Sequence, residues 1–451
     1  MQAETVETSN VLTTVEVLDR PATHSRARSN VGRRSDTAKA LMSIIDQGIY
    51  SGTSFVTAVI VGRATSPDVL GIYYLTMTIV YVAIGLQECM ISNPFAILSP
   101  RRHGRDLAEF ASSTWTYYLS WSGICLLGIL AALGYSSFAG DAHLTSGLQA
   151  LTFALPLLLL RECLRRFAFA RLRLPTAVAI DATSSTVQIA GLGLLAYFHQ
   201  LTLFGIFAVM AAGCAVASLG WIASNWQSRP PRPTRALEDL RHTWPIARWS
   251  LASFMLTNTI PFIMPWIVDS AAGAAAAGLF GASATLVGVT NVLVLGGSNF
   301  LMPRAAEAFA TRGAHGLSRV LLVMAILFIA AIGTFGTIIF ITGDRIPVFV
   351  YGAEFRGTGL LVATLAVNVL AGSLGMIAAQ GLLVIGRQKN NFVIDICMFT
   401  ITMVAAAILV PRYGALGAAQ ASVMGVTVGT LARAMKLVGI LRSMPAQPAG
   451  A

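Results

Sequence analysis

The stretch Ser92-Asn93-Pro94-Phe95, with Pro100-Arg101 after it, recurs about 206 residues later as Ser298-Asn299-Phe300, with Pro303-Arg304 after it. Other patches repeat at a similar offset: Gly71-Ile72-Tyr73 with Gly278-Leu279-Phe280, and the pair Arg173 and Asp181 with the pair Arg387 and Asp395. Both copies lie in strongly apolar sequence. In a membrane chain, such duplication indicates two related halves, and it favours a transporter whose site lies between them.

Composition supports a membrane protein. The chain has 451 residues, of which 55% are hydrophobic and 11% charged, with a mean hydropathy of +0.70. A soluble protein of this length carries roughly a quarter charged residues. We therefore predict an all-α polytopic membrane protein. The five cysteines show no metal-ligand spacing, so we expect neither a metal site nor a cofactor.

Twelve apolar segments are long enough to cross a hydrocarbon core of about 30 Å. We place them at 41–62, 70–92, 112–134, 147–166, 176–197, 201–223, 247–268, 273–300, 318–341, 358–385, 391–411 and 414–437. The domains expected from this pattern are a disordered basic tail (1–38), a six-helix bundle (39–223), a linker (224–246), a second six-helix bundle (247–441) and a short tail (442–451). An even division of six and six predicts bundles related by a pseudo-two-fold axis along the membrane normal.

The basic residues give the orientation. Of the 31 Lys and Arg residues, all but Arg63, Arg345, Arg356 and Arg412 fall on one side of this twelve-span topology. Basic loops stay in the cytoplasm, so both termini are expected there. The same distribution accounts for the net charge of +11 without a nucleic-acid partner. Outward loops are short and no GxxxxGK[ST] phosphate loop is present, which argues against an enzyme.

Polar residues inside the spans need a reason, because a charged side chain at the centre of a span costs about 2.5–3.5 kcal/mol. In span 1, Asp46, Tyr50, Thr53 and Thr57 share one helical face. We interpret this face as cavity-lining, with a packed Ser/Thr helix interface as the alternative. In span 2, Glu88 is a candidate for ion binding or for pairing with an arginine such as Arg101.

The equivalent span of the second half, span 7, begins with Arg248 and continues with Thr257 and Asn258. Pro261 and Pro265 each remove a helix hydrogen bond, which predicts a bend or local unwinding that could act as a gate. Asn291 in span 8 occupies a place similar to that of Glu88. The repeated residues Arg173, Asp181, Arg387 and Asp395 are candidates for structural ion pairs that hold each bundle together.

The order of several short motifs resembles the polysaccharide transporter (Wzx-type flippase) branch of the multidrug/oligosaccharidyl-lipid/polysaccharide (MOP) flippase superfamily. These motifs are Asp46-Gln47-Gly48, Val61-Gly62-Arg63, Ser66-Pro67, Leu70-Gly71-Ile72-Tyr73, the stretch from Asn93 to Arg102, Gly278-Leu279-Phe280, Gly386-Arg387 and Tyr413-Gly414-Ala415-Leu416-Gly417. The resemblance covers residues 40–440 and rests on order and spacing.

The resemblance implies a MATE-like fold and a transporter that flips a polyprenyl-pyrophosphate-linked oligosaccharide across the bacterial inner membrane. It also implies a cavity lined by spans 1, 2, 7 and 8, which favours Asp46, Tyr50, Glu88, Arg248, Asn258 and Asn291, with Thr53 and Thr257 on the same faces. Arg248 is the expected pyrophosphate partner. Expected partners are the lipid-linked glycan, membrane lipid, H⁺ or Na⁺ as coupling ion, and polysaccharide polymerase or export machinery.

Two other functions stay open. A MATE-type drug/cation antiporter shares the fold and predicts an acidic cavity, to which Asp46 and Glu88 could contribute. A non-transporting scaffold of a polysaccharide synthesis complex is the second. The chain also shows fewer cavity cations than relatives that flip anionic glycans, which leaves the charge of the substrate open.

Overall fold

The structure, a computed structural model, describes residues 26–140, 142–171, 173–224 and 233–444. The chain divides into two compact units, residues 1–42 and 43–451, and the packing, cavities and contacts described below belong to the second unit. All assigned elements in the described part are helices. The predicted all-α fold is therefore confirmed.

The first half consists of long helices of apolar sequence, with one short irregular segment. These elements are α1 (Arg26–Ala64), α2 (Pro67–Gln87), the π-helical turn η1 (Glu88–Ser92), α3 (Asn93–Leu98), η2 (Ser99–Arg101), α4 (Gly104–Ala139), α5 (Ala142–Ala170), α6 (Leu174–Tyr197) and α7 (Leu203–Ser224).

The second half contains α8 (Pro233–Gly288), α9 (Asn291–Thr342), α10 (Arg345–Tyr351), η3 (Ala353–Phe355), α11 (Gly359–Val384) and α12 (Gln388–Ser443). Three of these helices are broken where the backbone turns: at Gly273 (φ 83°) in α8, Gly313 (φ 59°) in α9 and Gly414 (φ 55°) in α12. Glycine adopts these positive φ values without steric cost, so each break reverses the chain between two spans.

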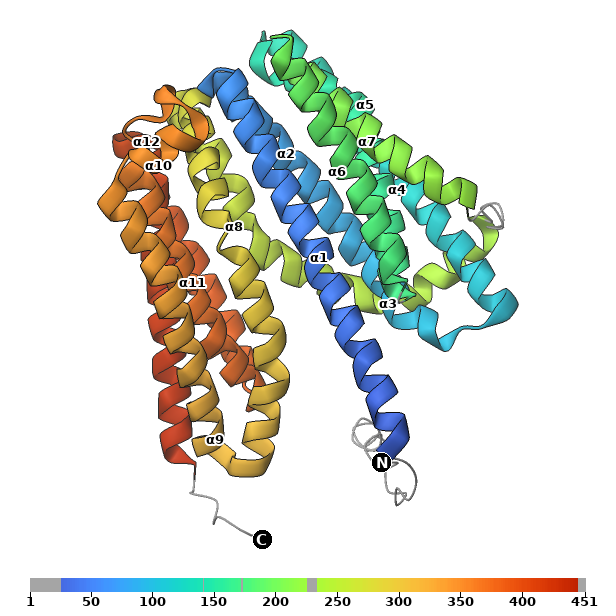
Figure 1. The fold of residues 1–451 in the computed structure, drawn as a ribbon, viewed down its shortest axis with the longest axis vertical. Helices are drawn as coiled ribbons and strands as arrows, with labels where there is room; N and C mark the ends of the chain where they lie inside the picture. Colours follow the sequence, from blue (N-terminus) through green and yellow to red (C-terminus); the bar gives the residue numbers. More distant parts are fainter. Residues whose placement is uncertain (1–25, 141, 172, 225–232, 445–451) are drawn as a thin grey trace, which may run out of the picture. The chain divides into compact units, whose positions relative to one another are not determined.

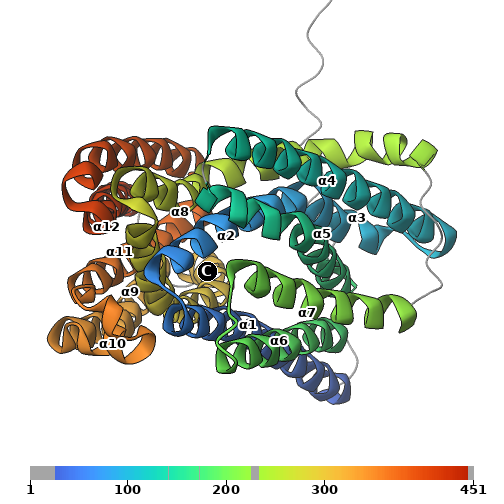
Figure 2. The same ribbon diagram turned by 90° about the horizontal axis from the view of Figure 1, so that it is seen from above.

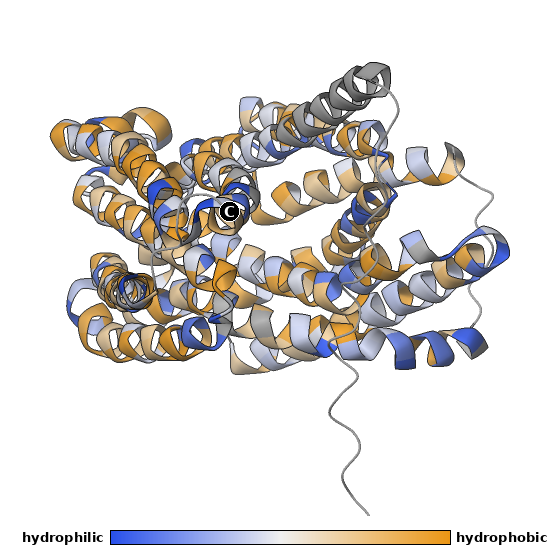
Figure 3. Ribbon diagram, turned by 90° about the horizontal axis from the view of Figure 1, so that it is seen from below, coloured by the Kyte–Doolittle hydropathy of each residue, from blue (hydrophilic) through white to orange (hydrophobic). Residues whose placement is uncertain are grey.

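Nine helices within the described residues are long and apolar enough to cross a membrane. Because α8, α9 and α12 are each divided by a glycine break, and α1 adds another helix, the described residues form twelve long helical segments, six in each half. Figure 3 shows hydrophobic residues along the helices and hydrophilic residues gathered mainly near helix ends and turns. The predicted twelve-helix architecture is the observed one.

The two halves meet along α2 and α8, which pack closely together (Figures 1 and 2). Near the N-terminal end of α2, a Cβ atom on Gly71 would overlap the carbonyl oxygen of Ala274, and a Cβ on Gly278 would overlap the carbonyl oxygen of Pro67. The repeated glycines of the two halves therefore contact each other, which is compatible with a pseudo-two-fold axis that passes close to them. Only glycine allows the backbones to approach this closely.

Further contacts between the halves lie at the end of the molecule that carries α10, here called the α10 end. Arg63 at the end of α1 donates to the carbonyl oxygens of Phe349 and Val350. The buried Tyr351 donates to the carbonyl oxygen of Ala282 at 3.1 Å and packs against Gly62. Burial of this phenol, which lies outside the spans, raises the pKa of Tyr351. The halves are thus joined at the α10 end.

Parts of two expected domains, the N-terminal tail and the linker, are helical in the structure. Residues 26–38, expected in a disordered tail, form the first turns of α1, because no proline interrupts the sequence there. The second part of the linker is helical from Pro233 onward, and it is held to α4 by ion pairs of Arg235 with Asp106 and Glu109. Residues 1–25 and 445–451, in the two expected tails, lie outside the described residues.

Candidate functional site

A cavity of about 510 Å³, here called the polar cavity, lies among α1, α2, η1, α5 and α8. Its wall combines charged side chains from three elements of the first half with aromatic rings. The lining residues are Asp46, Gln47, Tyr50, Tyr81, Ile84, Gly85, Glu88, Glu162, Arg165, Arg166, Phe169, Phe254 and Phe262. The cavity is mostly built by the first half, and only Phe254 and Phe262 come from α8.

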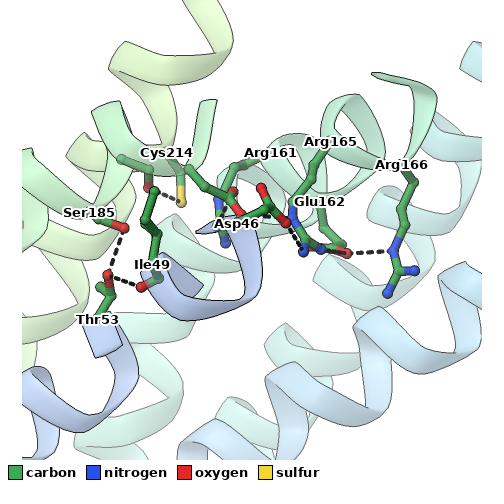
Figure 4. Close-up of polar contacts among 11 residues, drawn as sticks. Asp46, Ile49, Thr53, Arg161, Glu162, Arg165, Arg166, Ser185 and Cys214 are labelled. Atoms are coloured by element: carbon green, nitrogen blue, oxygen red, sulfur yellow. Dashed lines mark hydrogen bonds and ion pairs between the residues drawn. The ribbon is translucent and has the colours of Figure 1, made fainter. Parts of the chain in front are cut away.

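Arg165 is the centre of the charged wall (Figure 4). Its guanidinium group donates through Nη2 to Asp46 Oδ2 at 2.8 Å and through Nε to Asp181 Oδ2 at 2.8 Å. A third bond runs from Nη1 to Glu162 Oε1 at 3.1 Å. One buried arginine on α5 therefore joins α1 and α6, and the planar, always charged guanidinium suits this role.

The network extends from Arg165 in both directions along α5. Arg161 donates to Asp181 Oδ1 at 2.5 Å, so Asp181 is held by two arginines. Arg166 donates through Nε to Glu162 at 2.7 Å and through Nη2 to Glu88 Oε2 at 2.9 Å. The spacings of three and four residues place these α5 side chains on neighbouring positions of the helix surface.

The network contains four carboxylates and three guanidinium groups, which leaves one negative charge in excess. Buried charges are tolerated at membrane depth only when they are paired. Among the described residues, Asp46 Oδ1 has no hydrogen-bond partner, although it is buried. Asp46 belongs to the wall of the polar cavity, and one further positive charge, such as a proton, would neutralise the network.

The network differs in accessibility from one end to the other. The Asp181 side chain is fully buried and that of Arg165 is 9% exposed, whereas those of Arg166 and Glu88 are 35% and 30% exposed. The buried part holds α1, α5 and α6 together. The Arg166–Glu88 pair is the part that an incoming polar group can reach.

The polar face of span 1 divides between the cavity and a helix interface. Asp46 and Tyr50 line the polar cavity, and the guanidinium of Arg165 lies 5.3 Å from the Tyr50 ring centre. Thr53 instead bonds Ser185 of α6 at 2.7 Å (Figure 4), and Thr57 accepts a bond from Gln188 at 2.8 Å. The C-terminal part of the face thus contacts α6 through these hydrogen bonds, as in the Ser/Thr helix interface that was the alternative for this face.

The candidates from span 7 and span 8 lie elsewhere. Arg248 is exposed, with its guanidinium 5.8 Å from the Trp249 ring, and it does not line the polar cavity. Asn258 lines a neighbouring apolar groove, and Asn291 is exposed at the start of α9. The side chain of Thr257 lies outside the described residues. The backbone keeps helical angles at Pro261 and Pro265, so it is not unwound there, and the break in α8 is at Gly273.

Both repeated aspartates form ion pairs, but with other arginines than the repeated Arg173 and Arg387. Asp181 pairs with Arg161 and Arg165, and Asp395 pairs with Arg433, at the far end of α12. Arg387 is exposed and makes no ion pair within the described part of the chain. Arg173, just before α6, is also exposed.

The arginines and the glutamate of α5 are site residues that the sequence pattern did not indicate. Arg161, Glu162, Arg165 and Arg166 come at the C-terminal end of the predicted span 147–166. In the structure α5 continues to Ala170, so these residues lie inside the helix bundle. Charged residues at i, i+3 and i+4 in an apolar helix, together with carboxylates in spans 1 and 5, were the available signal.

No protein-family model and no curated protein matches this sequence. Solved structures match across most of the chain. An inward-facing multidrug resistance MATE family transporter of the MOP superfamily is similar over 88% of this chain and 96% of its own, with 14% identity and a TM-score of 0.71. The lipid II flippase MurJ, in an inward closed conformation, is similar over 90% and 88%, with 14% identity and a TM-score of 0.69.

An outward-facing MATE transporter of the same superfamily is similar over 90% of this chain and 95% of its own, with 15% identity and a lower TM-score of 0.59. These identities establish the fold alone. The chain has the fold of MOP superfamily transporters, and its helix arrangement is closer to the two inward structures than to this outward-facing one.

Proposed function

We propose that this protein flips a polyprenyl-pyrophosphate-linked oligosaccharide repeat unit across the bacterial inner membrane, for surface or exopolysaccharide synthesis. A glycan headgroup cannot cross hydrocarbon, so a polar cavity has to replace its hydration while the prenyl chain stays in lipid. The fold shared with a lipid II flippase is compatible with such a substrate.

The observation that carries the proposal is the accessible Arg166–Glu88 pair at the polar cavity, 2.9 Å apart and about one-third exposed. A pyrophosphate oxygen can take the place of the Glu88 carboxylate on Arg166, because guanidinium groups bind phosphate and carboxylate in the same geometry. In this role Arg166 replaces Arg248, which the resemblance favoured.

Transport then follows from rocking of the two halves. The contacts at the α10 end, among them Gly71 with Gly278 and Arg63 with α10, close one side of the cavity. The distribution of basic residues assigns this end to the outer face, with both termini in the cytoplasm. In this orientation the conformation described here has its outer side closed, in keeping with its likeness to inward structures. Opening the α10 end would release the glycan outward.

The excess negative charge of the network provides a place for a coupling ion. A proton or Na⁺ at the unpartnered Asp46 Oδ1 would balance the four carboxylates against the three arginines. Each such charge that moves with the membrane potential contributes about 2.3 kcal/mol per 100 mV. Polysaccharide polymerase or export machinery would receive the flipped unit.

Substitution of Arg166 tests the proposed substrate contact. Arg166→Gln should reduce surface polysaccharide about tenfold or more in a deletion strain that expresses the variant, because a hydrogen bond to a charged group contributes about 1.5–3 kcal/mol. Arg166→Lys should give an intermediate amount of surface polysaccharide, since lysine keeps the positive charge but lacks the two parallel N–H donors of the guanidinium group. Surface polysaccharide is measured with a glycan-specific stain, and protein amount by immunoblot.

The matched control is Arg171→Gln, which replaces an exposed arginine just beyond α5 and should leave export unchanged.

The excess of carboxylates favours a drug/cation antiporter as the second candidate. It predicts the opposite pattern: Glu88→Gln abolishes resistance to cationic drugs, Arg166→Gln preserves it, and surface polysaccharide is normal in the deletion strain. A scaffold would tolerate both substitutions and would still be needed for polysaccharide synthesis.

A further inference from the structure

A second cavity, of about 560 Å³, adjoins the polar cavity and is here called the apolar groove. It lies among α2, α4, α5 and α8, which pack beside one another in Figure 2. Phe254 and Phe262 line both spaces, with ring centres 6.0 Å apart, so these two rings form the boundary between them. A charged cavity and an apolar groove therefore meet at one pair of aromatic side chains.

The polar side chains of the groove wall donate hydrogen bonds to other groups of the protein. Thr78 donates to the Leu75 carbonyl and accepts from Trp266 Nε1, both at 2.7 Å. Trp121 Nε1 donates to the Ala83 carbonyl at 3.1 Å, and Asn258 Nδ2 donates to the Phe254 carbonyl at 3.2 Å. The rest of the wall is almost entirely hydrocarbon. A sugar or a charged drug would find few free hydrogen-bond donors there, whereas a hydrocarbon chain needs none.

The groove also lies beside a helix face that meets lipid. On α4, Trp121, Cys125, Gly128, Ile129 and Ala132 line the groove. Other large apolar residues of the same helix are exposed, including Leu119 (55%), Ile124 (60%) and Leu127 (68%). Because lipid is the solvent of these side chains, a lipid chain can enter the groove sideways past α4.

We propose that the apolar groove holds the pyrophosphate-proximal part of the substrate's prenyl chain while the headgroup occupies the polar cavity. This inference rests on the proposed function and adds a binding site for the chain. A molecule that spans both spaces must be polar at one end and hydrocarbon at the other, and it must bend at Phe254 and Phe262. The volume accepts only part of a long prenyl chain, and the remainder stays in the bilayer.

Filling the groove tests this inference. Gly128 lines it, and a Cβ atom there meets nothing within 4 Å, so a side chain can be added at this position and Gly128→Phe is expected to fill part of the groove. Gly134→Phe is the matched control: Gly134 is on the same helix, is equally unobstructed and does not line the groove. Binding of undecaprenyl pyrophosphate and of inorganic pyrophosphate is measured with the full-length protein in nanodiscs.

We expect Gly128→Phe to weaken binding of undecaprenyl pyrophosphate about tenfold and to leave binding of inorganic pyrophosphate unchanged, while Gly134→Phe changes neither. Equal binding of undecaprenyl pyrophosphate by wild type and Gly128→Phe would overturn the groove assignment. In that case, the proposed function would still stand if the wild-type protein restores surface polysaccharide in the deletion strain. If wild type binds the prenyl probe no better than inorganic pyrophosphate, the groove assignment also falls, and normal surface polysaccharide in the deletion strain would remove the proposed function itself.

A native cysteine provides a second measurement that needs no variant. Cys125 lines the groove, whereas Cys397 on α12 is exposed and is not one of the residues that line it. Undecaprenyl pyrophosphate should slow alkylation of Cys125 by N-ethylmaleimide about tenfold and leave Cys397 unaffected, and inorganic pyrophosphate should protect neither. Unchanged alkylation of Cys125 with the prenyl probe bound would contradict the proposal.

Discussion

Arg165→Gln is expected to destabilise the protein by about 3–5 kcal/mol and to abolish transport, because it leaves buried carboxylates without their partner. Arg165 donates to Asp46, Glu162 and Asp181, which belong to α1, α5 and α6. Asp46 depends on it most, since Arg165 provides its ion pair in the described structure, whereas Asp181 keeps Arg161. The loss of the guanidinium should therefore loosen α1 first.

The thermal unfolding midpoint of the detergent-purified variant measures this effect, together with export in the deletion strain. Arg171→Gln, an exposed arginine one turn or more beyond the network, serves as the control and should match wild type. The double variant Asp46→Asn/Arg165→Gln should be more stable than Arg165→Gln alone, because one uncompensated charge is removed. A wild-type midpoint for Arg165→Gln, or a double variant less stable than the single one, would contradict the proposed role of the network.

Gly71→Leu is the second large effect, and Gly278→Leu should reproduce it. A side chain at either position would overlap backbone of the opposite half, so α2 and α8 could no longer close at the α10 end. Leucine is a better helix former than glycine by roughly 1 kcal/mol, so a loss of function cannot be attributed to helix propensity. We expect export to fall to the level of the deletion strain and the α10 end to remain open.

Opening can be measured by labelling a buried position near the crossing from outside the cell. Ala277 is fully buried there, so Ala277→Cys should react slowly with a membrane-impermeant maleimide in the wild-type background and at least tenfold faster with Gly71→Leu. Gly193→Leu on α6, where a Cβ meets nothing within 4 Å, is the control. Normal export together with slow labelling in Gly71→Leu would show that the glycine crossing does not close the outer side.

Most of the fold could be predicted because membrane spans are determined by local composition. Long apolar runs and the placement of basic residues predicted the twelve helices, and the repeated Gly71 and Gly278 predicted the two halves. That these two glycines contact each other could not be derived, because the sequence carries no information on which helix faces its repeat. The three glycine breaks in α8, α9 and α12 follow from positive φ angles that are not visible in the sequence.

The candidate site was predicted in part. Asp46, Tyr50 and Glu88 do line the polar cavity, since their polar spacing in apolar helices required internal partners. The partners themselves were missed, because Arg165 and Arg166 come at the end of the predicted span 147–166, whereas α5 continues to Ala170. Arg248 was chosen for its charge at the start of span 7, but it is exposed and lies beside Trp249.

The repeated Ser-Asn and Pro-Arg patches also take on a more specific meaning in the structure. Asn93 donates to Ser250 Oγ of α8 at 3.0 Å, which links the start of α3 to the other half, away from the α10 end. In the second copy, the side chains of Ser298, Asn299 and Pro303 lie outside the described residues. The first copy is therefore a contact between the halves at the expected cytoplasmic side, where movement during transport must change the packing.

The most direct test of the proposed function is flipping by the purified protein in proteoliposomes. The vesicles contain an undecaprenyl-pyrophosphate-linked oligosaccharide with a fluorescent sugar, and a membrane-impermeant glycosidase outside cleaves only the exposed glycan. We predict that wild-type protein makes the internal pool accessible, and that Arg165→Gln and Gly71→Leu do not. Continued protection of the internal pool by wild-type protein, in vesicles that still accumulate a cationic drug, would contradict the flippase and favour the antiporter.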